Sequence, residues 1–234
     1  MTNLLAPLAL ALLQAAPALP PSFAYRFDEA KRSVYRRPQG DPAKEVKVSK
    51  GESAVSGDTV RTGWLGQAVL AVPERSVRFE VFADTEVRLA GGEPDVLLVV
   101  RHGRIKALFQ ALLEGRAQER RVAVPGALLA VRGTKYGVEV DRKGNSSLVV
   151  FEGVVEVLRP ESGKEPLRVK AGEWAAFGPG MAPRVEPMGM RGFSERSWNQ
   201  GMRPDGSMSP GSMSPGANMP KGMGRGPGSG HMPH

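Results

Sequence analysis

The side chains that could carry out catalysis are few in this chain of 234 residues. It contains no cysteine and three histidines, of which His231 and His234 lie in a Gly- and Pro-rich end. The third, His102, sits in the turn-like sequence RHGR, where a histidine is usually solvated. Nucleophilic catalysis needs a nucleophile, a base and a group that orients the base. The domain holds no such set and no G-x-S-x-G sequence, which argues against acyl-transfer chemistry.

Pairs of carboxylates could instead perform acid–base chemistry of the glycosidase kind. The candidates are the acidic residues of the predicted strands and turns, namely Asp58, Glu80, Glu86, Glu139, Glu152 and Glu173. A β-protein carries such a set on its outer faces without any catalytic role, and the metal-binding residue types are scarce in the domain. We therefore predict that the chain is not an enzyme and has no catalytic, cofactor or metal site.

Methionine gathers at the C-terminal end, where nine of the ten methionines lie at or after Met181. Thioether and imidazole ligands suit Cu(I), and two histidines end the chain. The same composition is equally typical of a low-complexity linker. Whether this end of the chain binds metal stays open from the sequence.

Most of the chain is explained better by architecture than by chemistry. From Glu45 to Pro187, short runs rich in Val, Leu and Phe alternate with Gly, Pro, Asp and Asn, as in closely spaced strands. In VRFEV (77–81) the apolar residues share one face, because successive side chains of a strand point to opposite sides. The pattern predicts an all-β domain over 45–187, built as a compact sandwich or a solenoid-like stack.

One segment of this domain also fits a helix. Its apolar residues have helical spacing: Ile105, Leu108, Phe109, Leu112 and Leu113. The neighbouring strands favour a strand for residues 104–108. We expect a short helix near 108–116.

The two ends of the chain differ from the domain. Residues 1–24 have the apolar stretch and small residues of a secretory signal, with cleavage points after Ala18 or Ala24, the latter preferred because polar sequence follows it. Residues 25–44 form a charged lead-in. Residues 188–234 are predicted to be a disordered Met/Gly/Pro/Ser-rich tail, in which Phe193 and Trp198 either pin the chain to the domain or are exposed. The mature protein is therefore expected to be periplasmic or secreted, with no transmembrane span after signal cleavage.

The net charge of +8 is spread along the chain, with 32 basic and 24 acidic residues interspersed. A nucleic-acid-binding protein gathers its basic residues on one face or stripe. We therefore expect no nucleic-acid partner.

Several phrases of the sequence, in this order, resemble the FecR-type domain family. They are GDTVRTG (57–63), VVRHGRI (99–105), VAVPGALLAVRGTKYGVEV (122–140), VVFEGVVEV (149–157) and LRVKAGEWAAF (167–177). The motif residues are Gly57, Asp58, Arg132, Gly133, Thr134, Glu152, Gly153 and Gly172. We interpret them as architecture: Gly133 permits a backbone turn or bulge, and the Thr134 hydroxyl bonds the local backbone there.

The resemblance implies an all-β, extracytoplasmic domain that is not an enzyme and that relays signals through protein contacts. From this sequence we expect neither the cytoplasmic sigma-binding region nor a retained transmembrane helix of that relay. We therefore expect a non-catalytic binding or sensing module in envelope signalling or regulation, with an envelope protein or another cell-envelope component as partner. The alternative is a structural or adhesive component that binds polysaccharide or peptidoglycan.

Overall fold

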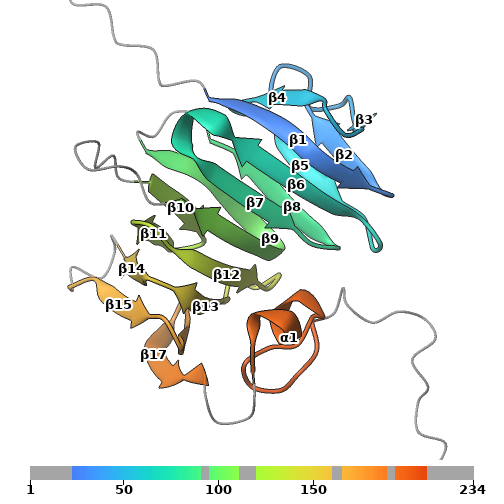
Figure 1. Ribbon diagram of the computed structural model, residues 1–234. Helices are drawn as coiled ribbons and strands as arrows, with labels where there is room; N and C mark the ends of the chain where they lie inside the picture. Colours follow the sequence, from blue (N-terminus) through green and yellow to red (C-terminus); the bar gives the residue numbers. More distant parts are fainter. Residues whose placement is uncertain (1–22, 91–94, 111–119, 160–164, 189–192, 210–234) are drawn as a thin grey trace, which may run out of the picture.

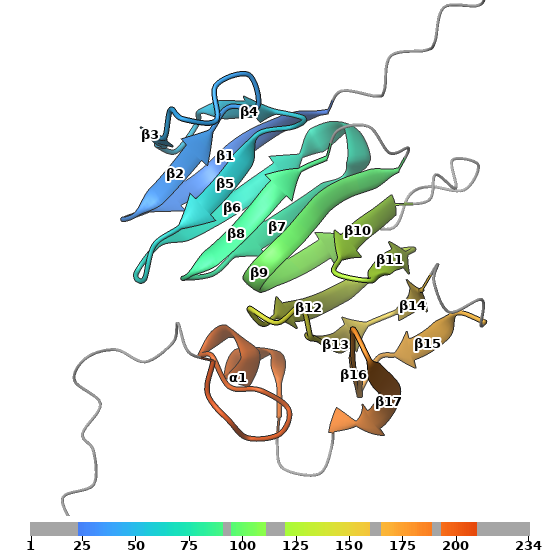
Figure 2. The same ribbon diagram turned by 180° about the vertical axis from the view of Figure 1, so that it is seen from behind.

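The computed structural model describes residues 23–90, 95–110, 120–159, 165–188 and 193–209. These residues form 17 strands, a 3-10 turn η1 (Pro73–Arg75) and a short helix α1 (Glu195–Asn199), as Figures 1 and 2 show. The predicted all-β fold is confirmed. The strands build one continuous network that folds into two layers and is not closed into a barrel.

The first layer contains the strands on which the candidate site is built. In spatial order they are β4 (Ser53–Val55), β1 (Ala24–Lys31), β6 (Gln67–Val72), β7 (Val77–Val81), β9 (Val96–Phe109), β12 (Lys135–Val140), β13 (Ser146–Glu152), β16 (Glu173–Gly178) and β17 (Met181–Pro187). Every neighbouring pair in this layer is antiparallel.

The second layer lies behind the first and shares β9 with it. Its order is β3 (Val46–Lys47), β2 (Val34–Arg37), β5 (Thr59–Thr62), β8 (Thr85–Leu89), β9, β10 (Arg120–Val124), β11 (Ala127–Val131), β14 (Val154–Leu158) and β15 (Leu167–Lys170). The β9–β10 pair is parallel, and the other pairs in this layer are antiparallel.

Strand β9 joins the layers because it bends at Gly103. Residues before the bend pair with β8 and β10, and residues after it pair with β7 and β12. Gly103 has a φ of +94°, and a Cβ there would lie 2.3 Å from Thr85 Oγ1, so a side chain is excluded. The sequence had suggested a turn between two strands here; the structure instead has a single strand of 14 residues.

One apolar core fills the space between the layers. It is formed by the side chains that each strand points inward. In β7, Val77, Phe79 and Val81 are buried as the alternation predicts. Phe109 packs edge-on against Phe79 and stacks on Tyr136, which ties β7, β9 and β12 together. Burial raises the pKa of the Tyr136 phenol, whose hydroxyl makes no hydrogen bond among the described residues.

Segments at the predicted domain boundaries contribute to the fold. Residues 25–44, expected as a lead-in, supply most of β1 and all of β2, which pair within the two layers. Residues 193–209, part of the predicted tail, include α1 and pack on the first layer. The rest of that tail, residues 189–192 and 210–234, lies outside the described residues. Leu108 and Phe109 end β9, and the rest of the helix expected near 108–116, from residue 111 onward, also lies outside them.

Two phrases of the FecR resemblance meet in space. Gly133 links β11 to β12 with a φ of +60°, and Gly153 links β13 to β14 with a φ of +81°. A Cβ on Gly153 would lie 2.7 Å from Thr134 Cγ2 and 2.8 Å from the Gly133 carbonyl oxygen. The expected hydrogen bond of Thr134 is absent: its buried Oγ1 has no partner among the described residues, and its methyl group packs under Gly153 instead.

The remaining motif residues also hold turns. Asp58 is buried and accepts hydrogen bonds from Arg36 at 2.9 Å, from the Gln39 N–H at 3.2 Å and from the Val55 N–H at 3.3 Å. Gly57 and Gly172 both have positive φ, at +94° and +86°. Arg132 is exposed beside Gly133, and Glu152 pairs with Lys135 at 3.4 Å.

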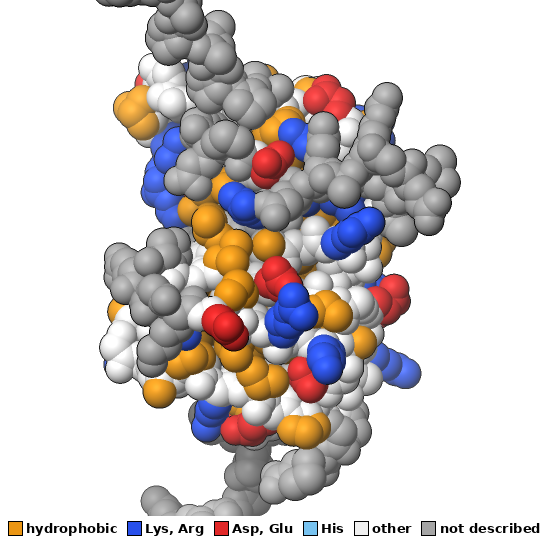
Figure 3. Space-filling view, turned by 90° about the vertical axis from the view of Figure 1, so that its left-hand side faces the viewer, with side chains coloured by type: hydrophobic (Ala, Val, Ile, Leu, Met, Phe, Trp, Pro, Cys, Tyr) orange, Lys and Arg blue, Asp and Glu red, His pale blue; other side chains and the backbone are white. Residues whose placement is uncertain are grey.

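In the part of the chain that the structure describes, no helix is long and apolar enough to cross a membrane. The side of the molecule at the left of Figure 1 is seen face-on in Figure 3. Lys, Arg, Asp and Glu side chains are interspersed there, with apolar side chains between them.

We expect Gly133→Val to destabilise the fold, because a β-branched residue is strained at positive φ. The strain should lower the free energy of unfolding by about 1–3 kcal/mol and the melting temperature by several degrees. The matched control is Gly40→Val, since a Cβ on Gly40 meets nothing within 4 Å and its φ is not left-handed. Equal melting temperatures for Gly133→Val and the wild type in a thermal scan would refute this interpretation.

Candidate functional site

The outer face of the first layer carries charged side chains that are buried. One row of directly paired residues crosses β7, β9, β12, β13 and β16. Its members, in that order, are Glu80, Lys106, Gly137, Val149 and Trp174. In the next row, Arg104 and Glu139 lie opposite each other on β9 and β12. Residues 193–209 cross this face and bury it. Figures 1 and 2 show the helix of this segment, α1, beside β12 and β13. We refer to these residues as the covering segment.

Trp198 anchors the covering segment over Gly137. Its side chain is fully buried and packs in a small cluster with Val149 and Trp174. A Cβ on Gly137 would lie 2.4 Å from Trp198 Cε2 and 2.7 Å from Nε1. Gly137 has no left-handed φ, so its backbone does not require glycine. The missing side chain makes room for the indole.

The Arg104 side chain lies over the indole ring of the same tryptophan. Its guanidinium donates a hydrogen bond to the Trp198 carbonyl oxygen and lies 4.3 Å from the centre of the indole ring. Phe82 lies on another side, at 5.2 Å from the guanidinium carbon. Burial lowers the pKa of Arg104 to about 10, although the Glu139 carboxylate favours the charged form. The residue keeps its charge at neutral pH because cation–π contacts and hydrogen bonds replace water.

Two lysines of the sheet converge on Glu195, the first residue of α1. Lys106 Nζ lies 3.0 Å from one Glu195 oxygen, and Lys135 Nζ lies 2.8 Å from the other. Lys106 also pairs with Glu80 at 2.9 Å. The Ser194 hydroxyl caps the helix by accepting from the Ser197 N–H, so α1 is held at its start by both a cap and an ion-pair cluster.

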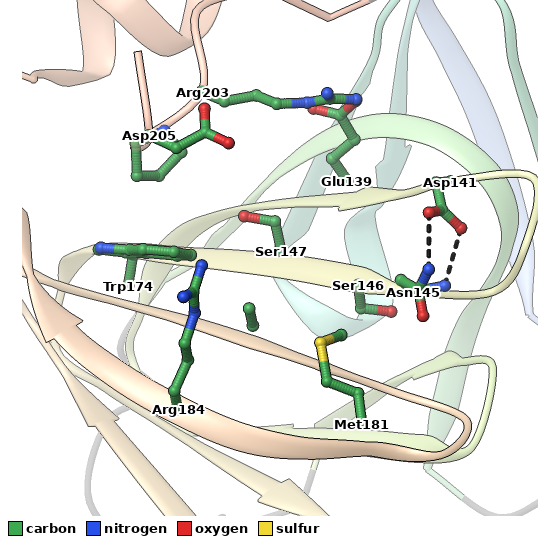
Figure 4. A pocket seen from close by; sticks show the side chains of 12 residues that line it. Glu139, Asp141, Asn145, Ser146, Ser147, Trp174, Met181, Arg184, Arg203 and Asp205 are labelled. Carbon is green, nitrogen blue, oxygen red and sulfur yellow. Dashed lines mark hydrogen bonds and ion pairs between the residues drawn. The ribbon is translucent and has the colours of Figure 1, made fainter. Parts of the chain in front are cut away.

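Glu139 binds the C-terminal end of the covering segment. Its Oε1 accepts hydrogen bonds from the Arg203 guanidinium and, at 2.8 Å, from the Ser209 hydroxyl. Its Oε2 lies 3.7 Å from Arg104 Nε. In Figure 4, Arg203 reaches across Glu139 at the rim of a cavity of about 180 Å³ whose opposite side holds Trp174 and Arg184. The hydrogen bond with Glu139 raises the pKa of Arg203.

Two larger hollows lie along the covering segment. One, of about 380 Å³, lies beside Asp84, His102 and Arg142 and is also lined by Arg104. The other, of about 330 Å³, lies beside the half-exposed Trp64 and Gln67 and reaches Asn199. All three cavities therefore border the same segment and the same charged face.

The structure separates the acidic residues that sequence reasoning had singled out. Glu80 and Glu139 reach the covered face, while Glu86 pairs with Arg101 at 3.0 Å on the second layer. Asp58, Glu152 and Glu173 hold local turns or pairs. Within the described ranges, no three His, Asp or Glu side chains are grouped closely enough to hold a metal ion. Among the motif residues of the FecR resemblance, Glu152 reaches the contacts of the covering segment, because it shares Lys135 with Glu195.

Sequence reasoning missed most of the covered face. Arg104 and Lys106 look like the solvated half of an alternating strand, and nothing local predicts their burial. A glycine inside a strand is one signal of close approach by another group, and Gly137 carries that signal in KYGVEV. Trp198, which the sequence left as either pinned or exposed, is buried.

Comparisons with known proteins add little about activity. No protein-family model matches this sequence, and no curated protein matches it. Two crystal structures of a putative anti-sigma factor from Parabacteroides distasonis, at 1.65 and 2.50 Å resolution, resemble the chain with a TM-score of 0.48 and 16% sequence identity. The similar region covers 61% of this chain and 65% or 64% of those chains, which is less than two thirds of their length.

The contact of the covering segment should weaken in acid. Burial disfavours the charge of Glu195, but hydrogen bonds from Lys135 and Lys106 outweigh burial and hold the pKa of this carboxyl below its usual 4.5. An acid with a lowered pKa stabilises the folded contact above its usual pKa and loses that contribution as pH falls through the lowered value. We expect acrylamide quenching of Trp198 emission to rise severalfold between pH 6 and pH 3, in a chain with Trp64→Phe and Trp174→Phe.

The control for this titration is Glu195→Gln in the same background, which should be quenched more strongly already at pH 6 and change less with pH. Far-UV circular dichroism reports whether the β-domain stays folded. Constant quenching down to pH 3 with an unchanged spectrum would contradict the assigned role of Glu195.

Proposed function

We propose that this chain is a non-catalytic, extracytoplasmic binding module of the FecR type, acting in envelope signalling or regulation through protein–protein contacts. The observation that carries the proposal is the covered face of the first layer. It binds a polypeptide segment through three kinds of contact. The space over Gly137 holds an indole, the Arg104 cation lies over the indole ring, and oppositely charged pairs form at both ends of the segment.

The charges of this face favour recognition over chemistry. Arg104, Lys106 and Glu139 each contact the covering segment or one another, so their charges are used in binding. Charged pairs that are removed from water contribute more to specificity than to affinity. A face of this kind suits selective binding of a protein segment.

The β17 edge of the first layer is a less favourable binding surface than this face. Edge strand β17 contains Pro183 and Pro187, which lack the N–H that an added strand would need, and it carries Arg184 and Glu186. Prolines and charges are typical of edges protected against strand addition. We therefore assign partner binding to the covered face.

The motifs of the FecR resemblance support the architecture of the proposed module. Gly133, Thr134 and Gly153 pack together at the crossing of two turns, which explains why the V-R-G-T and E-G-x-V phrases occur as a set. The role of these three residues is conformational. Other positions of the phrases that carry the resemblance belong to the proposed binding face, namely Arg104, Gly137 and Glu139.

The burial of Phe23 bears on where the proposed export signal is cleaved. This side chain lies in the core, its N–H donates to Ser56 Oγ at 2.8 Å, and the Arg75 guanidinium lies 4.8 Å from its ring centre. Cleavage after Ala24 would remove Phe23 from the domain, whereas cleavage after Ala18 would retain it. Because retention of Phe23 supports the earlier cleavage point, we propose cleavage after Ala18 in place of the Ala24 that the sequence favoured.

We expect the exported chain to begin at Leu19. Ala18→Arg should block processing, because the residue before a signal cleavage site must be small. Ala24→Arg is the matched control, since the side chain of Ala24 is exposed in β1. N-terminal sequencing of the protein from an envelope fraction decides the point, and a start at Tyr25 or an unprocessed chain would contradict it.

The proposed partner class is tested by site-specific photocrosslinking in the organism that makes the protein. Benzoylphenylalanine replaces Trp64, at the rim of the covered face, or Val154 on the second layer as the control; both side chains are half-exposed. We expect a discrete protein adduct from position 64 and none from position 154. Equal or absent protein adducts at both positions would contradict the assignment.

The alternative, a structural or adhesive role in binding polysaccharide or peptidoglycan, is favoured by one feature. Trp64 lies beside Gln67 and Asn199 in the same cavity, and an aromatic ring flanked by amides can bind a sugar. Co-sedimentation with purified peptidoglycan that is lost in Trp64→Ala, without any protein adduct, would support this role in place of the first.

A further inference from the structure

The covered face is shaped for a particular order of side chains. Gly137 lies between Lys106 and Val149 in a cross-strand row, and its missing side chain leaves a depression that fits an indole. The lysines on one side of the depression bind an acid, and Glu139 on the other side binds a base. In the covering segment these groups are Glu195, Trp198 and Arg203.

The covering segment is an incomplete match for this face. Three buried polar atoms at their contact make no hydrogen bond among the described residues: Trp198 Nε1, Arg104 Nε and Glu139 Oε2. Buried polar groups are normally satisfied, so a better-fitting ligand could pair Arg104 Nε and Glu139 Oε2 and satisfy the N–H of its own indole, the group that Trp198 leaves unpaired. The hollows beside Arg104 offer room for a ligand that is longer or bulkier than the covering segment.

The face can also exist without its cover. Arg104, Lys106 and Glu139 are charged, so water can solvate them once the segment leaves, unlike the apolar side chains of the core. Trp198 is the one large apolar side chain that the described helix α1 buries. Release of the segment exposes the small apolar cluster around Trp198, including Val149 and Trp174, and leaves the larger inter-layer core intact.

We infer that the covered face is a docking site for a partner protein segment bearing a tryptophan with an acidic residue three positions before it. Residues 194–209 occupy the site within the same chain and must be displaced. This inference rests on the proposed function and adds to it the chemistry of the partner and a built-in competitor. A ligand supplying an acceptor for the indole N–H and a donor for Glu139 Oε2 would compete best.

The test uses the full chain and a fluorescent peptide corresponding to residues 193–209. Trp198→Ala removes the anchor of the internal segment and should open the site to the peptide. We expect the peptide to bind Trp198→Ala at least tenfold more tightly than the wild type. The combined variant Trp198→Ala/Gly137→Val should lose this increase in peptide affinity, because a valine side chain fills the space that the indole would occupy.

Two peptide controls check the chemistry. A peptide with Trp198→Ala and one with Glu195→Lys should each bind at least tenfold more weakly than the parent peptide. Equal binding of all three peptides would overturn the assigned recognition. If Trp198→Ala does not fold by circular dichroism, Glu195→Ala in the full chain opens the same site by removing the partner of both lysines.

Failure of this inference is distinguishable from failure of the proposed function. No peptide binding to folded Trp198→Ala or Glu195→Ala overturns the docking site, even where position 64 still crosslinks to a protein. Equal peptide binding by wild type and variant overturns the internal competition. A wild-type dimer by light scattering that dissociates on adding the peptide would overturn the assigned partner, since the occupant would then be a second copy of this chain.

Discussion

The ion pair between Arg104 and Glu139 is the interaction on which the arrangement of the first layer and the covering segment depends. The two residues lie opposite each other on β9 and β12, and both are almost completely buried. Charges removed from water remain stable only when they are paired and hydrogen-bonded. Trp198, Arg203 and Ser209 supply those contacts, so the C-terminal segment and the sheet stabilise each other's charges. A sheet face built this way differs from a core face, because its side chains can also be solvated.

Glycine serves two separate purposes in this protein. Gly133 and Gly153 have positive φ and let the chain turn between strands, which fixes the architecture. Gly137 has an ordinary strand conformation and is needed for the space it leaves to the indole of Trp198. Both kinds occur in the family-like phrases, since Gly133 and Gly137 lie in the same run, 122–140. The glycines that turn the chain are thus different from the glycine proposed to receive a partner.

The strands were largely predictable because their inward and outward residues alternate, as in β7, and because glycines with positive φ mark the turns. Pairing between distant strands was not, since nothing local indicates that β10 lies parallel to β9. The bend at Gly103 was read as a turn because a glycine between two apolar runs is typical of both features. The covered face could not be predicted for a similar reason. Arg104 and Lys106 have the sequence pattern of solvated residues, and the segment that buries them lies about 90 positions later in the chain.

The outer face of the first layer is, in our proposal, a binding site filled by the covering segment, residues 193–209 of the same chain. Hydrogen–deuterium exchange of wild type and Gly137→Val tests it most directly, because the added side chain meets the indole while leaving the strand conformation possible. The account predicts that amides of 195–209 are protected in the wild type and exchange rapidly in the variant, while β6, β7 and β8 keep their protection. Unchanged protection of 195–209 in the variant, or loss of protection throughout the domain, would contradict it.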